Sequence, residues 1–340
     1  MNSPSVAVVI LNWNGRKFLE QYLPSVFNSS YTNLQVIVGD NHSTDDSVAY
    51  LAENFPLVKV IQNAENYGFS EGYNKVLAQV EADYFVLLNS DVEVHHHWIK
   101  PVIDLMESDE NIAIAQPKIK SVINRNEFEY AGAAGGFLDI LMYPFCRGRI
   151  FETIEQDKNQ YNNDCEIFWA SGCALFIKSS VWKRVKGLDA NFFAHMEEID
   201  LCWRVKNLGY KVMCCAKSTV WHLGGGTLAV ESPRKTFLNF RNNYYLIRKN
   251  LKPSKALWII PIRFCLDFLA LIKYVFAGKF GNAMAISKAH RNVILSFFSD
   301  KIKFNKDISP KPNTTGLYKN SIVWDYFVLK NKTFNKLRKS

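Results

Sequence analysis

The sequence lacks a regular cysteine pattern and a leader-like start. Its seven cysteines contain no C-x-x-C pair and follow no regular spacing, which excludes a disulfide framework and a zinc knuckle. We interpret them as reduced thiols in or near the core. Residues 1–4 place no basic segment ahead of a long apolar run, and the apolar run 6–11 is too short for a secretory signal. We therefore expect the protein to stay in the cytoplasm.

A recognised nucleic-acid-binding module is also absent, although the net charge is +9. Such an excess fits nucleic acid, an anionic membrane surface or a phosphorylated substrate. Much of it lies after residue 250 among apolar residues, and no segment interleaves basic residues with stacking aromatics. We therefore predict no nucleic-acid partner.

The chain is long enough to bury a large core, with 340 residues of which 48% are hydrophobic. One large domain over residues 1–250 and a basic, apolar helical tail over residues 251–340 are expected. The first part alternates β-branched runs with helical stretches, which predicts an α/β fold with a mainly parallel sheet covered by helices on both faces. The predicted strands are 6–11, 35–38, 58–61 and 84–88, and the helices between them are 17–28, 45–54 and 70–80.

Polar residues follow each predicted strand, in segments 12–15, 40–45, 63–68 and 89–91. In parallel sheets ligands bind at the carboxyl ends of the strands. These four segments therefore predict one binding rim. Residues 115–164 are rich in Gly and Asn and predict mixed strands and loops over that rim.

Asp40 directly follows a strand, and Asn41 and Ser43 add donors and acceptors suited to a base and a ribose. The alternative is a capping turn in which Thr44 or Asp45 caps the next helix. Both interpretations stay open from this segment alone.

Segment 66–75 places Gly68 and Gly72 around a helix start. Backbone N–H groups there can approach a phosphate or ribose closely, and the alternative is an ordinary turn.

Asp91 emerges where the apolar run 84–88 ends in Asn89 and Ser90. Mg²⁺ is commonly held by one or two carboxylates together with substrate phosphates, so this position favours a metal and phosphate site. The alternative is a cap of the helix predicted over 98–106. We interpret the neighbouring histidines 95–97 as surface or lid residues, since adjacent side chains point in different directions.

Glu197 and Glu198 open a helix behind an aromatic run, and Asp200 is followed at i+4 by Arg204. Acids at a helix start are favoured by the helix dipole alone. A carboxylate in a semi-apolar cleft would also have a raised pKa suited to a general base. We predict Glu198 as that base and Asp200–Arg204 as a structural pair.

His222 precedes three glycines, which predicts an imidazole ligand next to a loop that closes over a bound group. A structural histidine is the alternative.

Taken in order, these segments resemble the family 2 glycosyltransferases, and within them the bacterial branch that includes rhamnosyltransferase-like enzymes of surface-polysaccharide assembly. The resemblance covers residues 5–250 approximately and rests on the motifs in 8–15, 40–47, 66–74, 87–92 and 192–204.

The resemblance implies a GT-A fold, which is Rossmann-like, and an inverting transfer from a nucleotide-diphosphate sugar. By position Asp40 would contact the base, and Asp91 would be the metal-binding acid of the family's Asp-x-Asp element. Glu198 stands where the family usually has its aspartate base, and His222 where some members use a histidine beside the metal. We assign Trp169 and Gly172 to the acceptor side. The donor site is assigned to Asn12, Asn14, Asp40, Asn41, Ser43, Asn66, Gly68, Phe69, Asn74, Asn89 and Ser90.

Two positions depart from the family pattern. Asn89 replaces the first acid of the Asp-x-Asp element, and Glu198 is one methylene longer than the usual aspartate, so that Glu197 is an alternative base. In the resulting hypothesis Glu198 removes a proton from an acceptor hydroxyl, and a divalent metal (Mg²⁺ or Mn²⁺) held by Asp91 and His222 neutralises the departing diphosphate. The competing hypothesis is a nucleotide-sugar-binding scaffold of the same fold that has lost catalysis.

The tail segment 256–277 is long and apolar but is interrupted by Arg263, Asp267 and Lys273, which share one arc of a helical wheel. We predict an amphipathic helix on a membrane surface, with a core or dimer-packing helix as the alternative. Its basic flanks are Lys252, Lys255, Lys279, Lys288, Arg291, Lys301 and Lys303.

These observations predict a glycosyltransferase of bacterial polysaccharide synthesis that acts on a glycan or lipid-linked acceptor. A dTDP-rhamnose-like or UDP-sugar is the expected donor. The expected location is the cytoplasmic face of the inner membrane, and a homo-oligomer is left open.

Overall fold

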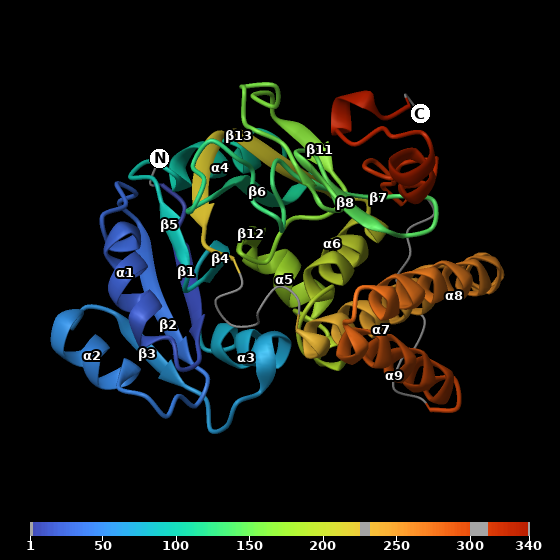
Figure 1. The fold of residues 1–340 in the computed structure, drawn as a ribbon. Helices are drawn as coiled ribbons and strands as arrows, with labels where there is room; N and C mark the ends of the chain where they lie inside the picture. Colours follow the sequence, from blue (N-terminus) through green and yellow to red (C-terminus); the bar gives the residue numbers. More distant parts are fainter. Residues whose placement is uncertain (1–2, 225–231, 300–311, 339–340) are drawn as a thin grey trace.

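The computed structural model describes residues 3–224, 232–299 and 312–338. A nine-stranded sheet runs through the molecule in the order β11-β13-β6-β12-β4-β1-β2-β3, with β5 paired to β13 (Figure 1). Helices cover the sheet, and the predicted α/β class is confirmed.

The N-terminal half of the sheet is parallel, as predicted. It is formed by β1 (Val6–Asn12), β2 (Leu34–Asp40), β3 (Lys59–Gln62) and β4 (Tyr84–Asn89). Alternate residues of β1 enter two different hydrophobic clusters, because both faces of the strand are covered. The intervening helices are α1 (Arg16–Phe27), α2 (Ser47–Asn54) and α3 (Gly68–Leu77).

The register of these strands builds the binding rim. Asn12 at the end of β1 lies beside Asp40 at the end of β2, and Leu11 lies beside Asn89 at the end of β4. Three of the predicted strand-end segments therefore meet at one edge of the sheet.

The second half of the sheet mixes directions. Strand β12 (Ala174–Lys178) runs antiparallel to β4 and to β6 (Ile112–Ser121), while β13 (Lys211–His222) runs parallel to β6. The short strands β5 (Val92–Val94) and β11 (Cys165–Ile167) both pair antiparallel with β13. The associated helices are α4 (Ile99–Glu107), α5 (Ser179–Val185) and α6 (Glu197–Asn207), with a 3-10 turn η1 (Ala190–Phe192) before α6.

A second, four-stranded sheet is formed by part of the predicted loop region. Its strands are β7 (Gly136–Leu138), β8 (Pro144–Cys146), β9 (Arg149–Ile150) and β10 (Thr153–Ile154). The chain returns to this sheet near its end, where Tyr318, Ile322 and Tyr326 pack against Phe145 and Ile150. A short π-helix, η2 (Trp324–Val328), and a short 3-10 helix, η3 (Phe334–Lys336), lie in this last stretch.

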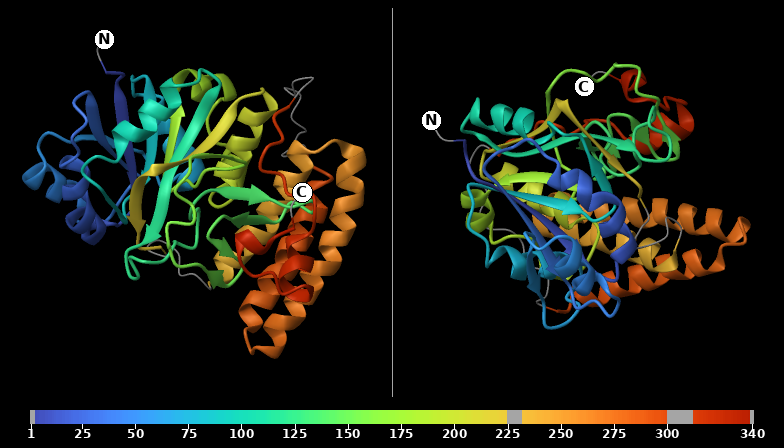
Figure 2. Two further views of the ribbon diagram at one scale, coloured as in Figure 1. Left: turned by 90° about the horizontal axis from the view of Figure 1, so that it is seen from above. Right: turned by 90° about the vertical axis from the view of Figure 1, so that its left-hand side faces the viewer.

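Three long helices follow the sheet, namely α7 (Pro233–Asn250), α8 (Pro253–Phe276) and α9 (Phe280–Ser296). They lie beside one another on the side of the molecule away from α1 and α2 (Figures 1 and 2). Within the described part of the chain, none of the helices combines the length and apolar character needed to cross a membrane.

The tail helix α8 was predicted to present its charged arc as the polar side of an amphipathic surface helix, and this needs a correction. Arg263 and Asp267 are buried against the protein, where Arg263 donates to the carbonyl of Leu141 at 3.0 Å and Asp267 accepts from Tyr244 Oη at 2.6 Å. Lys273 pairs with Glu152 at 2.8 Å. Arg263 and Asp267 therefore face the protein, because they find polar partners there, while Lys273 and its partner Glu152 stay exposed. Lys301 and Lys303 lie outside the described residues.

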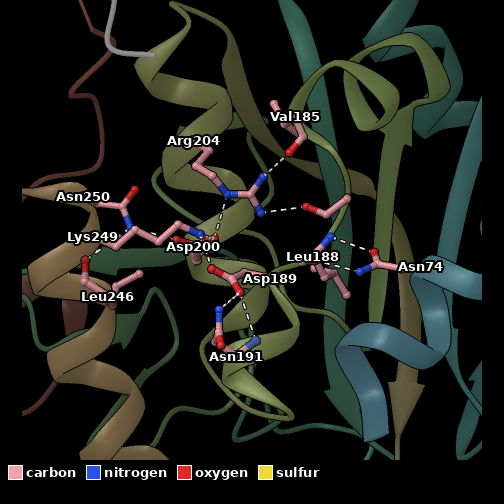
Figure 3. Close-up of polar contacts among 11 residues, drawn as sticks. Asn74, Val185, Leu188, Asp189, Asn191, Asp200, Arg204, Leu246, Lys249 and Asn250 are labelled. Carbon is pink, nitrogen blue, oxygen red and sulfur yellow. Dashed lines mark hydrogen bonds and ion pairs between the residues drawn. The ribbon is translucent and has the colours of Figure 1, made fainter. Parts of the chain in front are cut away.

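Asp200 joins α6 to α7 (Figure 3). Its carboxylate has no exposed surface and accepts from Arg204 Nε at 2.7 Å, Lys249 Nζ at 2.8 Å and Asn250 Nδ2 at 2.8 Å. Arg204 also donates to the carbonyls of Val185 and Gly187. The predicted Asp200–Arg204 pair is confirmed, and α7 adds two further donors to it.

We expect Asp200→Ala to lower the free energy of unfolding by about 3–5 kcal/mol, because it leaves two largely buried cations without their shared acceptor. Asp104→Ala is the control, since Asp104 forms an exposed i,i+4 pair with Lys100 and its loss should cost at most about 0.5 kcal/mol. Urea denaturation measures both, and equal effects would contradict the assignment.

The same pair gives a pH dependence. Burial alone would raise the pKa of Asp200, but Arg204 and Lys249 hold that pKa below its ordinary value. A depressed pKa in the folded state gives stability above the unfolded value of about 3.9, which is lost as the pH falls through the folded value. The difference between Asp200→Ala and the unaltered protein should therefore shrink in acid.

Candidate active site

The rim at the end of β1 and β2 is organised around Asp40, which is 3% exposed. Asp40 accepts from Asn12 Nδ2 at 3.2 Å and from the backbone N–H of Ser43 at 3.0 Å. The hydroxyl of Ser43 in turn accepts from the backbone N–H of Asn14 at 2.9 Å. Asp45, rather than Asp40, bonds the N–H of Ser47 at the start of α2. The N-cap residue of α2 is Asp46, which makes no side-chain cap bond, so Asp45 contacts the helix start and Asp40 stays at the rim.

A second cluster of amides closes the rim. Asn41 donates to Asn66 Oδ1 at 2.9 Å and to the carbonyl of Gly68 at 3.0 Å. Gly68 has φ +75°, and a side-chain carbon added there would lie 2.6 Å from the Phe193 ring. A glycine is therefore required both by the backbone and by the close approach of the segment before α6.

Asn74 lies away from the rim and has a structural role. Its amide exchanges two hydrogen bonds with the backbone of Leu188, at 2.8 and 2.9 Å (Figure 3). Its predicted donor contact has no support in this geometry, because both polar ends of the side chain are engaged there.

Asp91 and His222 meet at the carboxyl end of β4. The antiparallel pairing of β13 with β5 sets His222 opposite Val92, next to Asp91 in the chain. His222 Nε2 lies 3.1 Å from Asp91 Oδ1 and 3.3 Å from Asn89 Nδ2. Asp91 and His222 are each 6% exposed. The two residues predicted to bind a metal are therefore adjacent, and Gly225, Gly226 and Thr227 of the predicted loop lie outside the described residues.

Glu129 also lies beside His222, although no motif in the sequence points to it. Its Oε1 lies 3.5 Å from His222 Nδ1, on the side of the ring opposite Asp91, and the residue is 6% exposed. Burial alone would raise the pKa of Glu129, but His222 holds it below its ordinary value. Burial opposes the charged form of His222, yet Cys173, Glu129 and Asp91 together raise its pKa well above the ordinary value.

These residues fit a divalent cation only in combination with a substrate. Among residues 3–224, 232–299 and 312–338, no group of three or more His, Cys, Asp and Glu side chains is arranged to hold a metal ion. One carboxylate and one imidazole would nevertheless suffice where phosphate oxygens complete the ligand shell. Glu129 lies at ion-pair distance from Nδ1 without a hydrogen bond to it, and its charge favours a proton on that nitrogen, which leaves Nε2 as the ligand.

Glu197 and Glu198 lie at the start of α6, after two residues in the left-handed conformation, His195 (φ 70°) and Met196 (φ 73°). The side-chain amide of Asn242 in α7 holds this turn by donating to the carbonyls of 192, 194 and 195 at 2.7–2.9 Å. Helix α7 thus fixes the orientation in which α6 presents its two acids.

Both acids retain an oxygen without a hydrogen-bond partner in the described structure. Glu197 is buried and Glu198 is half-buried. Burial raises the pKa of Glu198 to about 7. Burial and the charge of Glu198 together raise the pKa of Glu197 well above its ordinary value. A carboxyl group with such a pKa can exchange a proton near neutral pH.

Gly172 connects the two ends of the site. A side-chain carbon added to it would lie 3.4 Å from the Phe69 ring and 3.7 Å from Glu198 Cβ. The next residue, Cys173, accepts the backbone N–H of Asn89 at 3.0 Å. The turn at Gly172 therefore lies between the acids of α6 and the end of β4.

Two predicted features lie outside this opening. Trp169 is 5% exposed, with its ring against Gly136 and its N–H donated to the carbonyl of Phe137 at 2.9 Å. It therefore supports the wall and has little surface for an acceptor. The histidines 95–97 are exposed, as predicted.

Comparison with known proteins decides the family. The sequence profile of Glycosyl transferase family 2 matches residues 7–184, which is just over half of the chain. The chain belongs to this family. It is therefore a glycosyltransferase, and the family predicted from the motifs is confirmed.

Characterised relatives include rhamnosyltransferases. The chain is 19% identical over 273 residues to an N-acetylglucosaminyl-diphospho-decaprenol L-rhamnosyltransferase of Mycobacterium tuberculosis, covering 76% of this chain and 88% of that protein. It is 22% identical over 220 residues to the rhamnosyltransferase WbbL of Escherichia coli, covering 61% and 79%. An uncharacterised glycosyltransferase of Haemophilus influenzae is 24% identical over 219 residues, and the match covers 61% of this chain and 62% of that protein.

Solved structures confirm the GT-A fold of this family 2 member. GalNAc-T7 with UDP, GalNAc and Mn²⁺ superposes with a TM-score of 0.57 at 18% identity, covering 72% of this chain and 48% of that one. A mannosyltransferase of Pyrobaculum calidifontis in complex with GDP-Man and Mn²⁺ gives 0.51 at 12% identity, covering 88% and 82%.

We expect Glu129→Gln to lower the pKa of His222 in protein freed of metal by chelation, because one of two flanking carboxylates is lost. Histidine ring resonances followed by NMR against pH measure this. Glu127→Gln is the matched control in the same segment, since Glu127 bonds Asn124 at the surface. An unchanged titration in Glu129→Gln would show that Glu129 does not act on His222.

Proposed function

We propose that this glycosyltransferase moves a sugar from a nucleotide-diphosphate sugar to a hydroxyl of a glycan or lipid-linked acceptor, with inversion, in bacterial cell-surface polysaccharide synthesis. The rhamnosyltransferase relatives favour a dTDP-rhamnose-like donor over other nucleotide sugars. The Glu198 carboxyl gives this proposal its main support. It has an oxygen without a hydrogen-bond partner in the described structure, a pKa of about 7, and a position across Gly172 from the end of β4.

Each end of the site has its own task in this proposal. On the donor side, the rim built by Asp40, Asn12 and Ser43 binds the nucleoside. Asn12 Oδ1 supports this role, since it is a buried acceptor without a partner in the described structure. On the acceptor side, Glu198 accepts the proton of the attacking hydroxyl, and Phe69 and Gly172 shape the wall beside it.

The metal site is part of the proposal. Asp91 and His222 would hold a divalent cation, Mg²⁺ or Mn²⁺, with Glu129 orienting the imidazole. When bound, the cation supplies charge neutralisation for the departing diphosphate. Because Asn89 stands in place of an acid, Asp91 is the one carboxylate of segment 89–91, and the amide of Asn89 lies 3.3 Å from His222 instead.

Glu198→Gln should lower kcat by about 10² to 10⁴ while leaving donor affinity nearly unchanged, because the amide cannot accept the proton. The kcat of the unaltered enzyme should rise with pH through about 7, as Glu198 loses its proton. Initial rates of sugar transfer measure both effects. Glu110→Gln, at an exposed position, is the control.

Glu197→Gln separates the two acids. A loss confined to Glu197→Gln, with full activity in Glu198→Gln, would move the base to Glu197. Retained activity in both variants would remove the base role from α6 altogether.

In a panel of UDP-, dTDP- and GDP-sugars with Mn²⁺, the sugars of one nucleotide should raise the melting temperature of the protein more than the others do. A ligand present at about 100 times its Kd stabilises the folded state by about 2.7 kcal/mol. Differential scanning fluorimetry measures the shift. Donor binding without transfer to any acceptor or to water would favour a scaffold of the same fold, an alternative suggested by Asn89. No shift with any donor would contradict donor binding.

A further inference from the structure

Helix α8 presents an apolar stripe to solvent. Its members recur at helical spacing along one side of the helix, and the exposed fractions reach 74% at Leu257, 78% at Trp258 and 86% at Phe276. We define the α8 stripe as Leu257, Trp258, Ile262, Phe268, Leu269, Val275 and Phe276. Single exposed apolar residues are ordinary, but a continuous row of large ones marks an interaction surface.

The stripe is exposed because polar contacts fix the rotation of α8 about its axis. Asp267 is 1% exposed and accepts from Tyr244 Oη at 2.6 Å and Tyr143 Oη at 3.3 Å, with His290 Nε2 at 3.4 Å. Arg263 is 3% exposed and donates to the carbonyl of Leu141. Turning the stripe inward would remove these partners from both charges, which is costly in a buried place.

The α8 stripe is long enough to contact an extended partner surface along the whole helix. Helix α8 has 24 residues, which corresponds to about 36 Å at a rise of 1.5 Å per residue. Figures 1 and 2 show α8 at the edge of the molecule, with α7 and α9 alongside. The protein occupies its inner side, so only the outer side is free to meet a partner.

The charge around the stripe selects the partner. Lys252 and Lys255 are exposed before it, and Lys273 is exposed near its other end, with an ion pair to Glu152. The only acid between residues 252 and 299 is the buried Asp267. In a pair of α8 helices from two copies, lysines would face lysines in either orientation, because both ends of the stripe are basic. An anionic phospholipid surface offers charge of the opposite sign to both ends.

We propose that α8 docks the protein on an anionic phospholipid membrane, with the α8 stripe in the interfacial layer and the lysines at the headgroups. Apolar burial and electrostatic attraction act together, which a stable peripheral contact needs. The proposal concerns a surface away from the candidate active site and holds whatever sugar is transferred.

Sedimentation of the full chain with vesicles tests this docking. We expect binding to vesicles of equal parts phosphatidylcholine and phosphatidylglycerol, and weak binding to phosphatidylcholine alone. Phe268→Glu with Leu269→Glu should weaken binding to the anionic vesicles about tenfold or more. Lys252→Gln with Lys255→Gln should weaken it on the order of 25-fold, at about 1 kcal/mol per lysine, and raised salt should act in the same direction.

The control is Leu57→Glu, an equally drastic change at an apolar side chain that is 89% exposed between α2 and β3. It should leave vesicle binding unchanged. Circular dichroism melting of every variant checks the fold, which substitutions at exposed positions should preserve.

Three results would overturn the proposal. Absence of binding to anionic vesicles is the first, and equal binding by the Phe268→Glu, Leu269→Glu variant is the second. The third is a dimer, detected by light scattering, that the same variant converts to a monomer. That result would identify the α8 stripe as an interface between two copies.

Discussion

The antiparallel pairing of β13 with β5 is the constraint on which the site depends. It brings His222 to Asp91, although 131 residues separate them in the chain. The parallel pairing of β13 with β6 carries β13 to the same rim that β1, β2 and β4 have already formed. The metal-binding proposal, the role of Glu129 and the placement of the diphosphate all follow from this meeting of the two halves of the sheet.

Helix α7 plays the corresponding part for the acids. Lys249 and Asn250 neutralise and satisfy Asp200, while Asn242 holds the left-handed turn in front of Glu197. The C-terminal helices are therefore more than an appendage to the sheet. Through α7 they orient the start of α6, and through α8 they present an apolar surface on the outside.

The sequence was most informative for residues whose position follows directly from the end of a strand or helix. The β-branched and apolar runs predicted β2 and β4 beside β1, and this placed Asp40 and Asp91, which come at or just after the ends of β2 and β4, at one rim. The sequence could not reveal Glu129, because residues 115–164 carry no periodic pattern. The contact of Glu129 with His222 depends on the pairing of strands that are far apart in the chain. Asn74 belongs to a predicted binding motif, and yet its side chain hydrogen-bonds the backbone of Leu188. The sequence does not show this contact, because 114 residues separate the two. The predicted orientation of α8 was wrong, because helical periodicity identifies two faces of a helix without showing which one packs against the protein.

The central claim is that Asp91 and His222 form the leaving-group end of a transferase site whose base lies on α6. Its most direct test is a crystal structure of the protein with Mn²⁺ and a nucleoside diphosphate, in which anomalous scattering locates the metal. The account predicts one strong peak in contact with an Asp91 oxygen, His222 Nε2 and the diphosphate. A nucleotide bound with its metal away from both side chains would contradict it.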